Sequence, residues 1–158
     1  MNTGKPNIAN SPNEMILGTE LNIDRAIIGD PCPIPLFATK IVAGFPSPAD
    51  DYIEGQLDLN QHLIKHPAAT FFVRVSGDSM IRAGIHPGDI LVVDRSLTPV
   101  DGKVVIAVVN SELTVKRLKI KQGKPTLVAD NPKFPAIQIT EDMGFEIWGV
   151  VLHVIHSV

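Results

Sequence analysis

A serine on a tight turn is the first residue of this sequence with the character of a nucleophile. Ser79 lies in the segment SGDSM, directly after the strand-like run TFFVRV. Gly77 can adopt backbone conformations that other residues avoid, so the turn can present Ser79 Oγ at the end of a strand. The same composition is also common in ordinary surface turns. A catalytic role for Ser79 therefore requires a base that can take its proton.

Lys116, further along the chain, is the candidate base. In the run ELTVKRLKI (residues 112–120), strand alternation places Lys116 on one face with Thr114, Leu118 and Ile120. Burial among aliphatic side chains would lower the pKa of Lys116, because the charged ammonium loses its hydration. A neutral amine can accept the proton of a serine hydroxyl. The alternative is a solvated lysine, since the opposite face of this run also carries basic residues.

Histidine, cysteine and metal chemistry have less support. The five histidines have no convincing acidic partner in the sequence, so a Ser-His-Asp triad is unsupported rather than excluded, and each histidine is expected at the surface or at a strand edge. Two of them have helical spacing but no third metal ligand nearby, so neither a metal nor another cofactor is expected. The lone Cys32 has no activating neighbour. The histidines are His62, His66, His86, His153 and His156.

The composition indicates one domain with some additional tail. The chain has 158 residues, of which 44% are hydrophobic and only 5% aromatic, so a core must be built from Val, Ile and Leu. The net charge is -3 and both signs are mixed along the chain. This gives no electrostatic reason to expect direct, sequence-specific DNA binding, which usually requires a clustered basic face.

The sequence also favours a cytoplasmic protein without a membrane anchor. No apolar run approaches the roughly 18 to 20 residues needed to span a bilayer. The start of the chain, MNTGKPNIANSPNEM, has no hydrophobic region of the kind found in secretory signals. A single cysteine cannot form an internal disulfide, which fits a reducing compartment.

The first third of the chain reads as an extended arm. Residues 1–56 are rich in proline, which removes a backbone donor and blocks helix interiors, so they are expected to include most of the mobile chain. A short helix is predicted from Asp58 to His66. Asp58 can cap it, with Gln61 completing a capping box. Pro67 then ends the helix.

From Thr70 onward the pattern changes to β-strands. Short β-branched runs are separated by turn sequences such as HPGD, VDGK, KQGKP and DNPKFP. Strands with this length and spacing indicate a mostly antiparallel β domain of barrel or sandwich type. The runs are TFFVRV, DILVVD, KVVIAVV, ELTVKRLKI, PTLVAD and FEIWGVVLHVI.

These motifs together resemble the Ser-Lys self-cleaving peptidases of the LexA/UmuD group. The order SGDSM followed by TVKRL matches the nucleophile and base motifs of that group. The longer segments FPSPADDYIEGQLDLNQHLIKHPAATFFVRVSGDSM, GIHPGDILVVDRS and FEIWGVVLHVIHSV are similar to its UmuD branch of polymerase accessory proteins. The resemblance covers the chain from about Pro33 to its end, whereas residues 1–30 have no clear counterpart.

The resemblance implies roles for particular residues. It makes Ser79 the nucleophile and Lys116 the general base. The matching cleavage site is the dipeptide Ala43-Gly44 in KIVAGFPSP. The backbone N–H groups of Asp78 and Ser79 are candidates for stabilising the oxyanion.

The resemblance also implies a fold and a domain organisation. The expected fold is a small β-rich catalytic domain of the LexA/signal-peptidase type with an extended N-terminal arm. Residues 1–43 would be the arm removed by self-cleavage. Residues 44–69 would be a mobile arm with a short helix, and residues 70–158 would form the Ser-Lys peptidase domain.

The implied function is that of an accessory subunit in the SOS response. The implied protein is a homodimer whose self-cleavage is promoted by a RecA–single-stranded DNA filament. The trimmed form, residues 44–158, would then work with a UmuC-type error-prone polymerase in translesion synthesis.

Three alternatives remain at the level of sequence. A LexA-like or phage-type repressor would need a helix-turn-helix domain, for which residues 1–43 are too short and too rich in proline. A signal-peptidase relative would share the Ser-Lys chemistry but would need a membrane anchor. A non-enzymatic β domain would be left if Lys116 were solvated.

Overall fold

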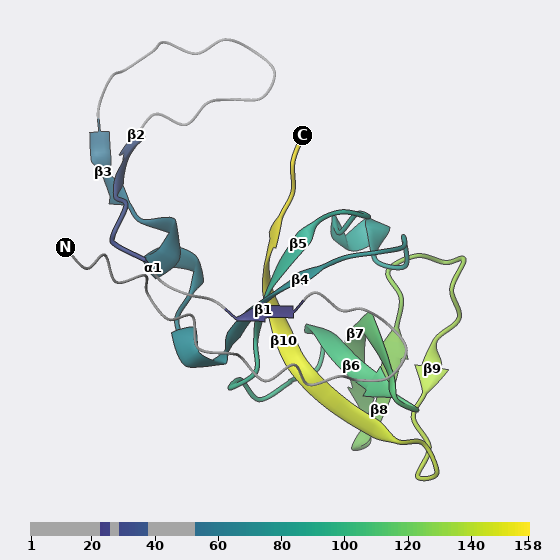
Figure 1. The fold of residues 1–158 in the computed structure, drawn as a ribbon. Helices are drawn as coiled ribbons and strands as arrows, with labels where there is room; N and C mark the ends of the chain where they lie inside the picture. Colours follow the sequence, from purple (N-terminus) through teal and green to yellow (C-terminus); the bar gives the residue numbers. More distant parts are fainter. Residues whose placement is uncertain (1–22, 26–28, 38–52) are drawn as a thin grey trace, which may run out of the picture.

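The computed structural model describes residues 23–25, 29–37 and 53–158 of the chain, and Figure 1 shows their arrangement. Strands predominate among these residues, with one short α-helix and two 3-10 turns. The elements are β1 (Ile23–Arg25), β2 (Ile34–Phe37), β3 (Ile53–Leu57), α1 (Leu59–Leu63), η1 (Pro67–Ala69), β4 (Thr70–Arg74), η2 (Ile81–Ala83), β5 (Ile90–Asp94), β6 (Val104–Val109), β7 (Glu112–Lys121), β8 (Lys124–Val128), β9 (Ile137–Gln138) and β10 (Phe145–Ile155).

The large sheet confirms the predicted mostly β, antiparallel fold. Among the described residues, eight strands follow the order β1-β4-β5-β10-β6-β7-β8-β9, and every pairing is antiparallel. Each of the runs predicted from Thr70 onward forms a strand within a few residues of its expected bounds. β-branched residues between turn sequences were therefore sufficient to locate the strands.

β10 joins the two halves of the large sheet. Its first half pairs with β6 and its second half pairs with β5, and its register shifts once against each partner. In Figure 1 it is the long yellow strand that curves through the domain. The absence of a side chain at Gly149 permits this curvature, because a Cβ there would lie 2.6 Å from Val93 Cγ1. The sheet thus bends at a point where only glycine fits without movement of the core.

Two apolar clusters form the core of the domain. The first contains Met80, Leu91 and Ile106, and the second contains Val105 and Leu118. β6 contributes alternate residues to the two clusters, as its period of two requires. The core is aliphatic, which agrees with the low aromatic content of the sequence.

The predicted helix is present but shorter than expected. α1 covers only Leu59–Leu63, and Pro67 begins the 3-10 turn η1 instead of directly ending the helix. Asp58 caps α1 as predicted, but its carboxylate accepts from the amide of Asn60 at 2.8 Å, not from that of Gln61. The prediction of a capping box with Gln61 is therefore wrong, because the helix consists of barely more than one turn.

The proline-rich region contains more paired backbone than its composition suggests. β2 and β3 form a separate two-stranded antiparallel sheet, which lies to one side of the large sheet in Figure 1. The Cys32 amide donates a hydrogen bond of 3.0 Å to Asp58 Oδ2, which links this segment to the helix cap. β1 adds to the edge of the large sheet beside β4.

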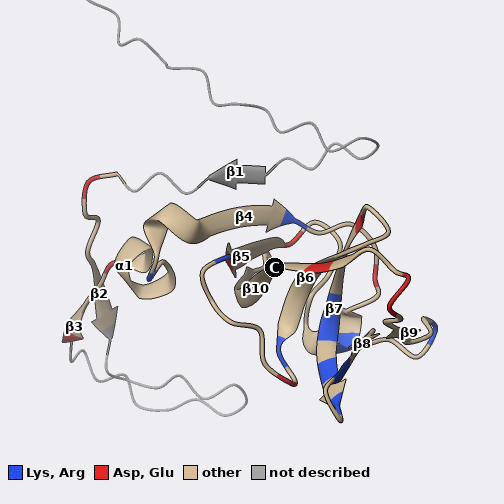
Figure 2. Cartoon of the chain, turned by 90° about the horizontal axis from the view of Figure 1, so that it is seen from below, with Lys and Arg blue, Asp and Glu red and all other residues tan. Residues whose placement is uncertain are grey.

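Basic residues are grouped along β7 and β8, as Figure 2 shows. The mixed order of charges in the sequence does not reveal this grouping. Lys116 is buried and Arg117 is paired with Asp130, so the solvent-exposed charges of these strands include Lys121 and Lys124. Within residues 23–25, 29–37 and 53–158, none of the helices has the length and apolar character needed to cross a membrane.

The close approach at Gly149 gives a first prediction. Gly149→Ala should lower the free energy of unfolding by about 1–3 kcal/mol, because the added methyl group must displace a buried valine. Urea denaturation measures the change. Gly55→Ala is the matched control in β3, since a Cβ there meets nothing within 4 Å. Equal unfolding free energies for the Gly149 variant and the wild type would contradict the steric account of the bend.

Candidate active site

The turn that carries Ser79 leaves β4 and is held at several points. Gly77 has a φ of 83°, so the turn uses the glycine conformation that the sequence predicted. The Asp78 carbonyl accepts hydrogen bonds from the amide of Ile81 at 3.2 Å and from Asn131 Nδ2 at 2.9 Å. Met80 is 2% exposed and packs in the first apolar cluster. The turn that carries Ser79 is thus held by the positive-φ Gly77 on one side and by the buried Met80 on the other.

Lys116 lies in the middle of β7 and is buried, with 7% of its surface exposed. It pairs with Val105 of β6 and shares its face of the strand with Leu118, and both neighbours belong to the second apolar cluster. This confirms the predicted apolar setting of Lys116. Ile120, predicted on the same face, is 39% exposed near the strand end, so it contributes little to the burial of Lys116.

The Lys116 amine and the Ser79 hydroxyl are in direct contact. Lys116 Nζ lies 3.1 Å from Ser79 Oγ, a hydrogen-bond distance. The same nitrogen lies 2.8 Å from Thr114 Oγ1 and 3.0 Å from the Val115 carbonyl oxygen. The carbonyl can only accept, and the threonine hydroxyl can accept as well. If these two oxygens take the hydrogens of a neutral amine, its lone pair points to Ser79.

The burial of Lys116 lowers its pKa below the ordinary value of 10.5. The cause is desolvation, which destabilises the charged ammonium relative to the neutral amine. Lys116 makes no ion pair within the part of the chain that the structure describes. A carboxylate beside it would have the opposite effect, so its surroundings favour the form that can accept a proton.

The backbone of the turn offers donors next to the hydroxyl. Among the described residues, the amide N–H groups of Asp78 and Ser79 have no hydrogen-bond acceptor. Unpaired amides beside a nucleophile are the groups from which an oxyanion hole is built. The Asp78 carbonyl oxygen accepts a hydrogen bond from Asn131. This carbonyl belongs to the same peptide unit as the Ser79 N–H, so the orientation of that N–H is defined.

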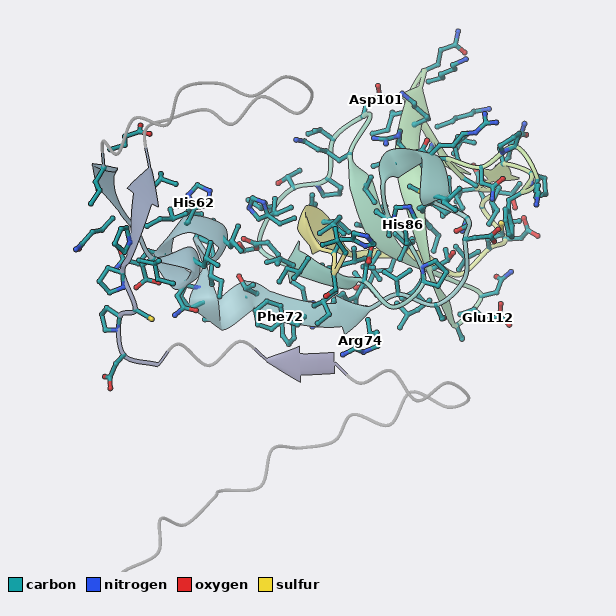
Figure 3. The ribbon with its side chains drawn as sticks, turned by 90° about the horizontal axis from the view of Figure 1, so that it is seen from above. His62, Phe72, Arg74, His86, Asp101 and Glu112 are labelled. Carbon is teal, nitrogen blue, oxygen red and sulfur yellow. The ribbon has the colours of Figure 1, made fainter. Side chains whose placement is uncertain are left out.

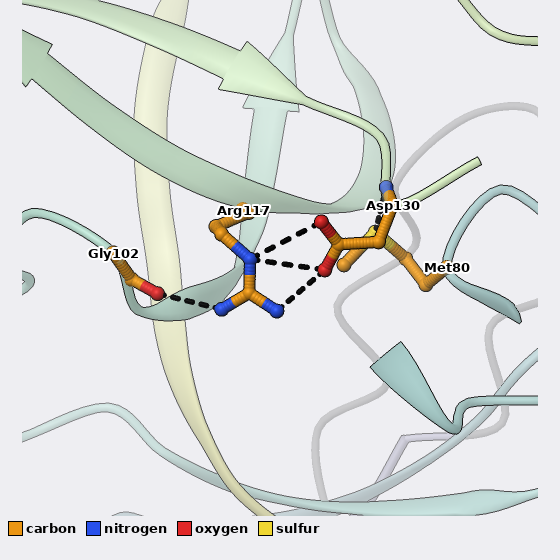
Figure 4. A network of polar contacts seen from close by, with 4 residues as sticks. All are labelled: Met80, Gly102, Arg117 and Asp130. Atoms are coloured by element: carbon orange, nitrogen blue, oxygen red, sulfur yellow. Dashed lines mark hydrogen bonds and ion pairs between the residues drawn. The ribbon is translucent and has the colours of Figure 1, made fainter. Parts of the chain in front are cut away.

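A network behind the turn connects β7 to the loop that follows β8 (Figure 4). Arg117 contacts Asp130 through Nε at 2.9 Å and through Nη2 at 2.5 Å, and its Nη1 donates to the Gly102 carbonyl at 2.7 Å. The Asp130 amide in turn lies 3.4 Å from Met80 Sδ. Next in the loop is Asn131, which holds the Asp78 carbonyl. The network therefore ties the strand of Lys116 to the turn of Ser79.

A hollow of about 360 Å³ adjoins this network. Ser79 and Lys116 do not line this hollow, so the Ser-Lys contact lies outside it. The residues that line it are Arg82, Arg117, Ala129, Asp130, Asn131 and Pro132.

The expectation that the histidines lack acidic partners is wrong for three of them, since His86 and His156 both approach Asp89 and His66 Nδ1 lies 2.6 Å from the buried Asp94. Ser96 Oγ also contacts Asp94, at 2.6 Å, so the serine and the histidine share one carboxylate and do not form a triad relay. Burial would raise the pKa of Asp94, but hydrogen bonds from Ser96 and His66 outweigh this effect and lower it. His62, on α1, lies well apart from His86 in Figure 3.

The structure thus brings together Ser79 and Lys116, while the predicted cleavage dipeptide Ala43-Gly44 lies outside the described residues. Sequence reasoning missed Thr114 and Asn131. Thr114 could have been found, because strand alternation already placed it on the Lys116 face. Asn131 could not, since nothing local connects it to the Ser79 turn.

Comparison with known proteins places these features in context. The family model described as Peptidase S24-like matches residues 35–152. The chain is 49% identical to the protein MucA of Salmonella typhimurium over 121 residues, which cover 76% of this chain and 82% of MucA. It is 52% identical to the protein ImpA of Escherichia coli over 124 residues, 77% of this chain and 83% of ImpA. The LexA repressor of Photorhabdus laumondii is 36% identical over 125 residues, 78% of this chain and 61% of the repressor.

Proposed function

The chain belongs to the Peptidase S24-like family, and from this premise we propose that it cleaves itself with Ser79 as nucleophile and Lys116 as general base. Membership identifies it as a self-cleaving serine peptidase, and the UmuD-like relatives MucA and ImpA confirm its resemblance to the UmuD branch. The observation that carries the assignment of the dyad is the distance of 3.1 Å between Lys116 Nζ and Ser79 Oγ.

The first chemical step is attack on the arm of the chain. Neutral Lys116 accepts the Ser79 proton while Oγ forms a bond to the carbonyl carbon of Ala43. The carbonyl oxygen becomes an oxyanion, for which the amides of Asp78 and Ser79 are the proposed donors. Lys116 then gives its proton to the Gly44 nitrogen as the peptide bond breaks. The fragment starting at Gly44 leaves, and Ala43 remains as an ester on Ser79.

The second step returns the enzyme to its starting state. Lys116 removes a proton from a water molecule, which attacks the Ala43 ester and releases residues 1–43 with a free carboxylate. The proton returns to Ser79 Oγ. Because the substrate is a segment of the same chain or of a dimer partner, its effective concentration is high without a deep binding pocket. Ile41 and Val42 can align it by adding a strand beside the site.

In the cell we assign the product, residues 44–158, to translesion DNA synthesis in the SOS response. The likeness to MucA and ImpA over more than four fifths of their length supports an accessory protein of an error-prone, UmuC-type polymerase. The lower identity to a LexA repressor makes the repressor the weaker assignment. The protein is proposed to act as a cytoplasmic homodimer. A RecA–single-stranded DNA filament would promote cleavage by favouring a competent position of the arm.

The dyad and the cleavage site can be tested together by mass spectrometry. The wild-type chain should yield one product that begins at Gly44. Ser79→Ala and Lys116→Ala should each slow its formation by at least about a thousandfold, since each removes a partner of the reacting pair. Ser76→Ala, an exposed serine on the same turn, should be processed like the wild type. Fragments that begin elsewhere, or that persist in the Ser79 variant, would refute the assignment.

The rate of self-cleavage should rise with pH. The reaction needs neutral Lys116, whose pKa is lowered by burial but still governs the fraction of amine that can accept a proton. The rate should therefore increase above about pH 7 and level off below the ordinary lysine pKa of about 10.4, because the amine is already neutral there. Timed gel assays measure the rate, with Ser79→Ala at each pH as the control for chemical breakdown. A flat or falling profile would count against Lys116 as the base.

The proposed activation by a RecA–single-stranded DNA filament is tested at neutral pH. Adding RecA, single-stranded DNA and a nucleoside triphosphate should accelerate formation of the Gly44 product, whereas RecA or DNA alone should not. An unchanged rate with the assembled filament would argue against this mode of activation without affecting the dyad.

A further inference from the structure

Three potential metal ligands that take no part in the Ser-Lys contact meet at the end of the β5–β10 pair. Ile90 of β5 is paired with Ile155 of β10, so Asp89 and His156 follow as the next residues beyond this pair. His86 begins the turn HPGD that leads to Asp89, and its region can be followed in Figure 3. Two segments distant in sequence therefore deliver two imidazoles and one carboxylate to one place.

The ligand atoms are close to the spacing that a metal requires. His156 Nδ1 lies 2.6 Å from Asp89 Oδ1, and His86 Nδ1 lies 3.7 Å from Asp89 Oδ2. One atom from each of the three residues lies within 4.8 Å of the others. Ligands about 2.0–2.2 Å from a tetrahedral zinc ion are about 3.3–3.6 Å apart, so small side-chain rotations would suffice.

A second observation points to a missing ligand. His86 Nδ1 is buried and has no hydrogen-bond partner among the described residues. A buried polar atom without a partner is unfavourable, and an ion or water at that position is one of its ordinary explanations. The ring of His86 lies 5.0 Å from that of His156, so the unpaired nitrogen belongs to the same cluster.

We propose that His86, Asp89 and His156 form a binding site for one divalent transition-metal ion of the zinc class. Two neutral imidazoles and a carboxylate are a common ligand set for zinc, with a water molecule as the fourth ligand. The side chains of both histidines are more than two fifths exposed although His86 Nδ1 itself is buried, so the cluster lies at the surface with one ligand atom facing inward. Asp89 is 4% exposed and supplies the inner wall.

The contacts of Asp89 prepare it to be a ligand. Its Oδ2 accepts a hydrogen bond of 2.7 Å from the His86 amide, which leaves Oδ1 for the metal and fixes the carboxylate plane. To coordinate through Nδ1, neutral His156 would carry its ring proton on Nε2. Arg74 donates to the neighbouring Gly88 carbonyl and forms no ion pair with Asp89 in the described part of the chain.

A metal here would fasten the C-terminal segment to the turn that supports the nucleophile. Val75, just before the Ser79 turn, donates to the Asp89 carbonyl at 2.9 Å and accepts from the Gly88 amide at 2.9 Å. The expected role is structural: the ion would hold the C-terminal segment against the strand that leads into the Ser79 turn.

The test is equilibrium dialysis of the full chain, stripped of metal, against zinc chloride. The wild type should bind one Zn²⁺ per chain, and Co²⁺ should give the visible absorption of a low-symmetry site. His86→Gln and His156→Gln should each weaken zinc binding by about 10–100-fold or more. Loss of an outer-shell partner alone costs about that much, and these residues are proposed as direct ligands. His153→Gln, on the same strand as His156 but outside the cluster, should bind like the wild type.

The outcomes separate the proposal from its competitors. Thermal unfolding of each metal-free variant verifies that it folds, and zinc should raise the unfolding temperature of the wild type and of His153→Gln only. If zinc does not bind, the cluster is only a hydrogen-bonded anchor and the proposal is overturned. Binding that is unchanged by both His86→Gln and His156→Gln would place the ion elsewhere and overturn it equally.

Discussion

The contact on which the site depends is the one between a buried amine and a hydroxyl, Lys116 Nζ and Ser79 Oγ, 3.1 Å apart. A lysine among aliphatic side chains is an unfavourable element of a fold, because its charged form has lost its hydration. Thr114 and the Val115 carbonyl offset part of that cost and orient the nitrogen. The same environment that makes Lys116 a poor structural residue suits it to the proposed role of general base.

The rest of the domain holds these two groups in register. Ser79 follows β4 and Lys116 lies on β7, and β10 stands between these strands in the order of the sheet. Hydrogen bonds from Asn131 to Asp78, together with the contacts of Asp130, connect the two sides directly. The reactive pair is thus held both by the sheet and by a loop, which suits a reaction that tolerates little displacement.

The sequence was informative wherever the determining interactions are local. Strand periodicity located the β runs and placed Lys116 with Leu118, and the special conformation of Gly77 followed from its residue type. The sequence was less informative where the two partners of a hydrogen bond come from distant segments. No local pattern pairs Asp89 with His156, or Asp94 with His66, because each contact is created by strand pairing. The β2–β3 sheet was not predicted, because the prolines in this part of the chain indicated an extended arm and outweighed its strand-forming residues.

The central position of β10 has a consequence for biosynthesis. A ribosome makes the arm first, then the segment with Ser79, then the strand with Lys116, and only afterwards the strand that β5 and β6 both need as a neighbour. A nascent chain that ends before residue 145 lacks the element that unites the two halves of the sheet. The arm with the proposed target is therefore made first, and the strand that completes the sheet around the proposed dyad is made last, so the site is completed only after β10 has emerged.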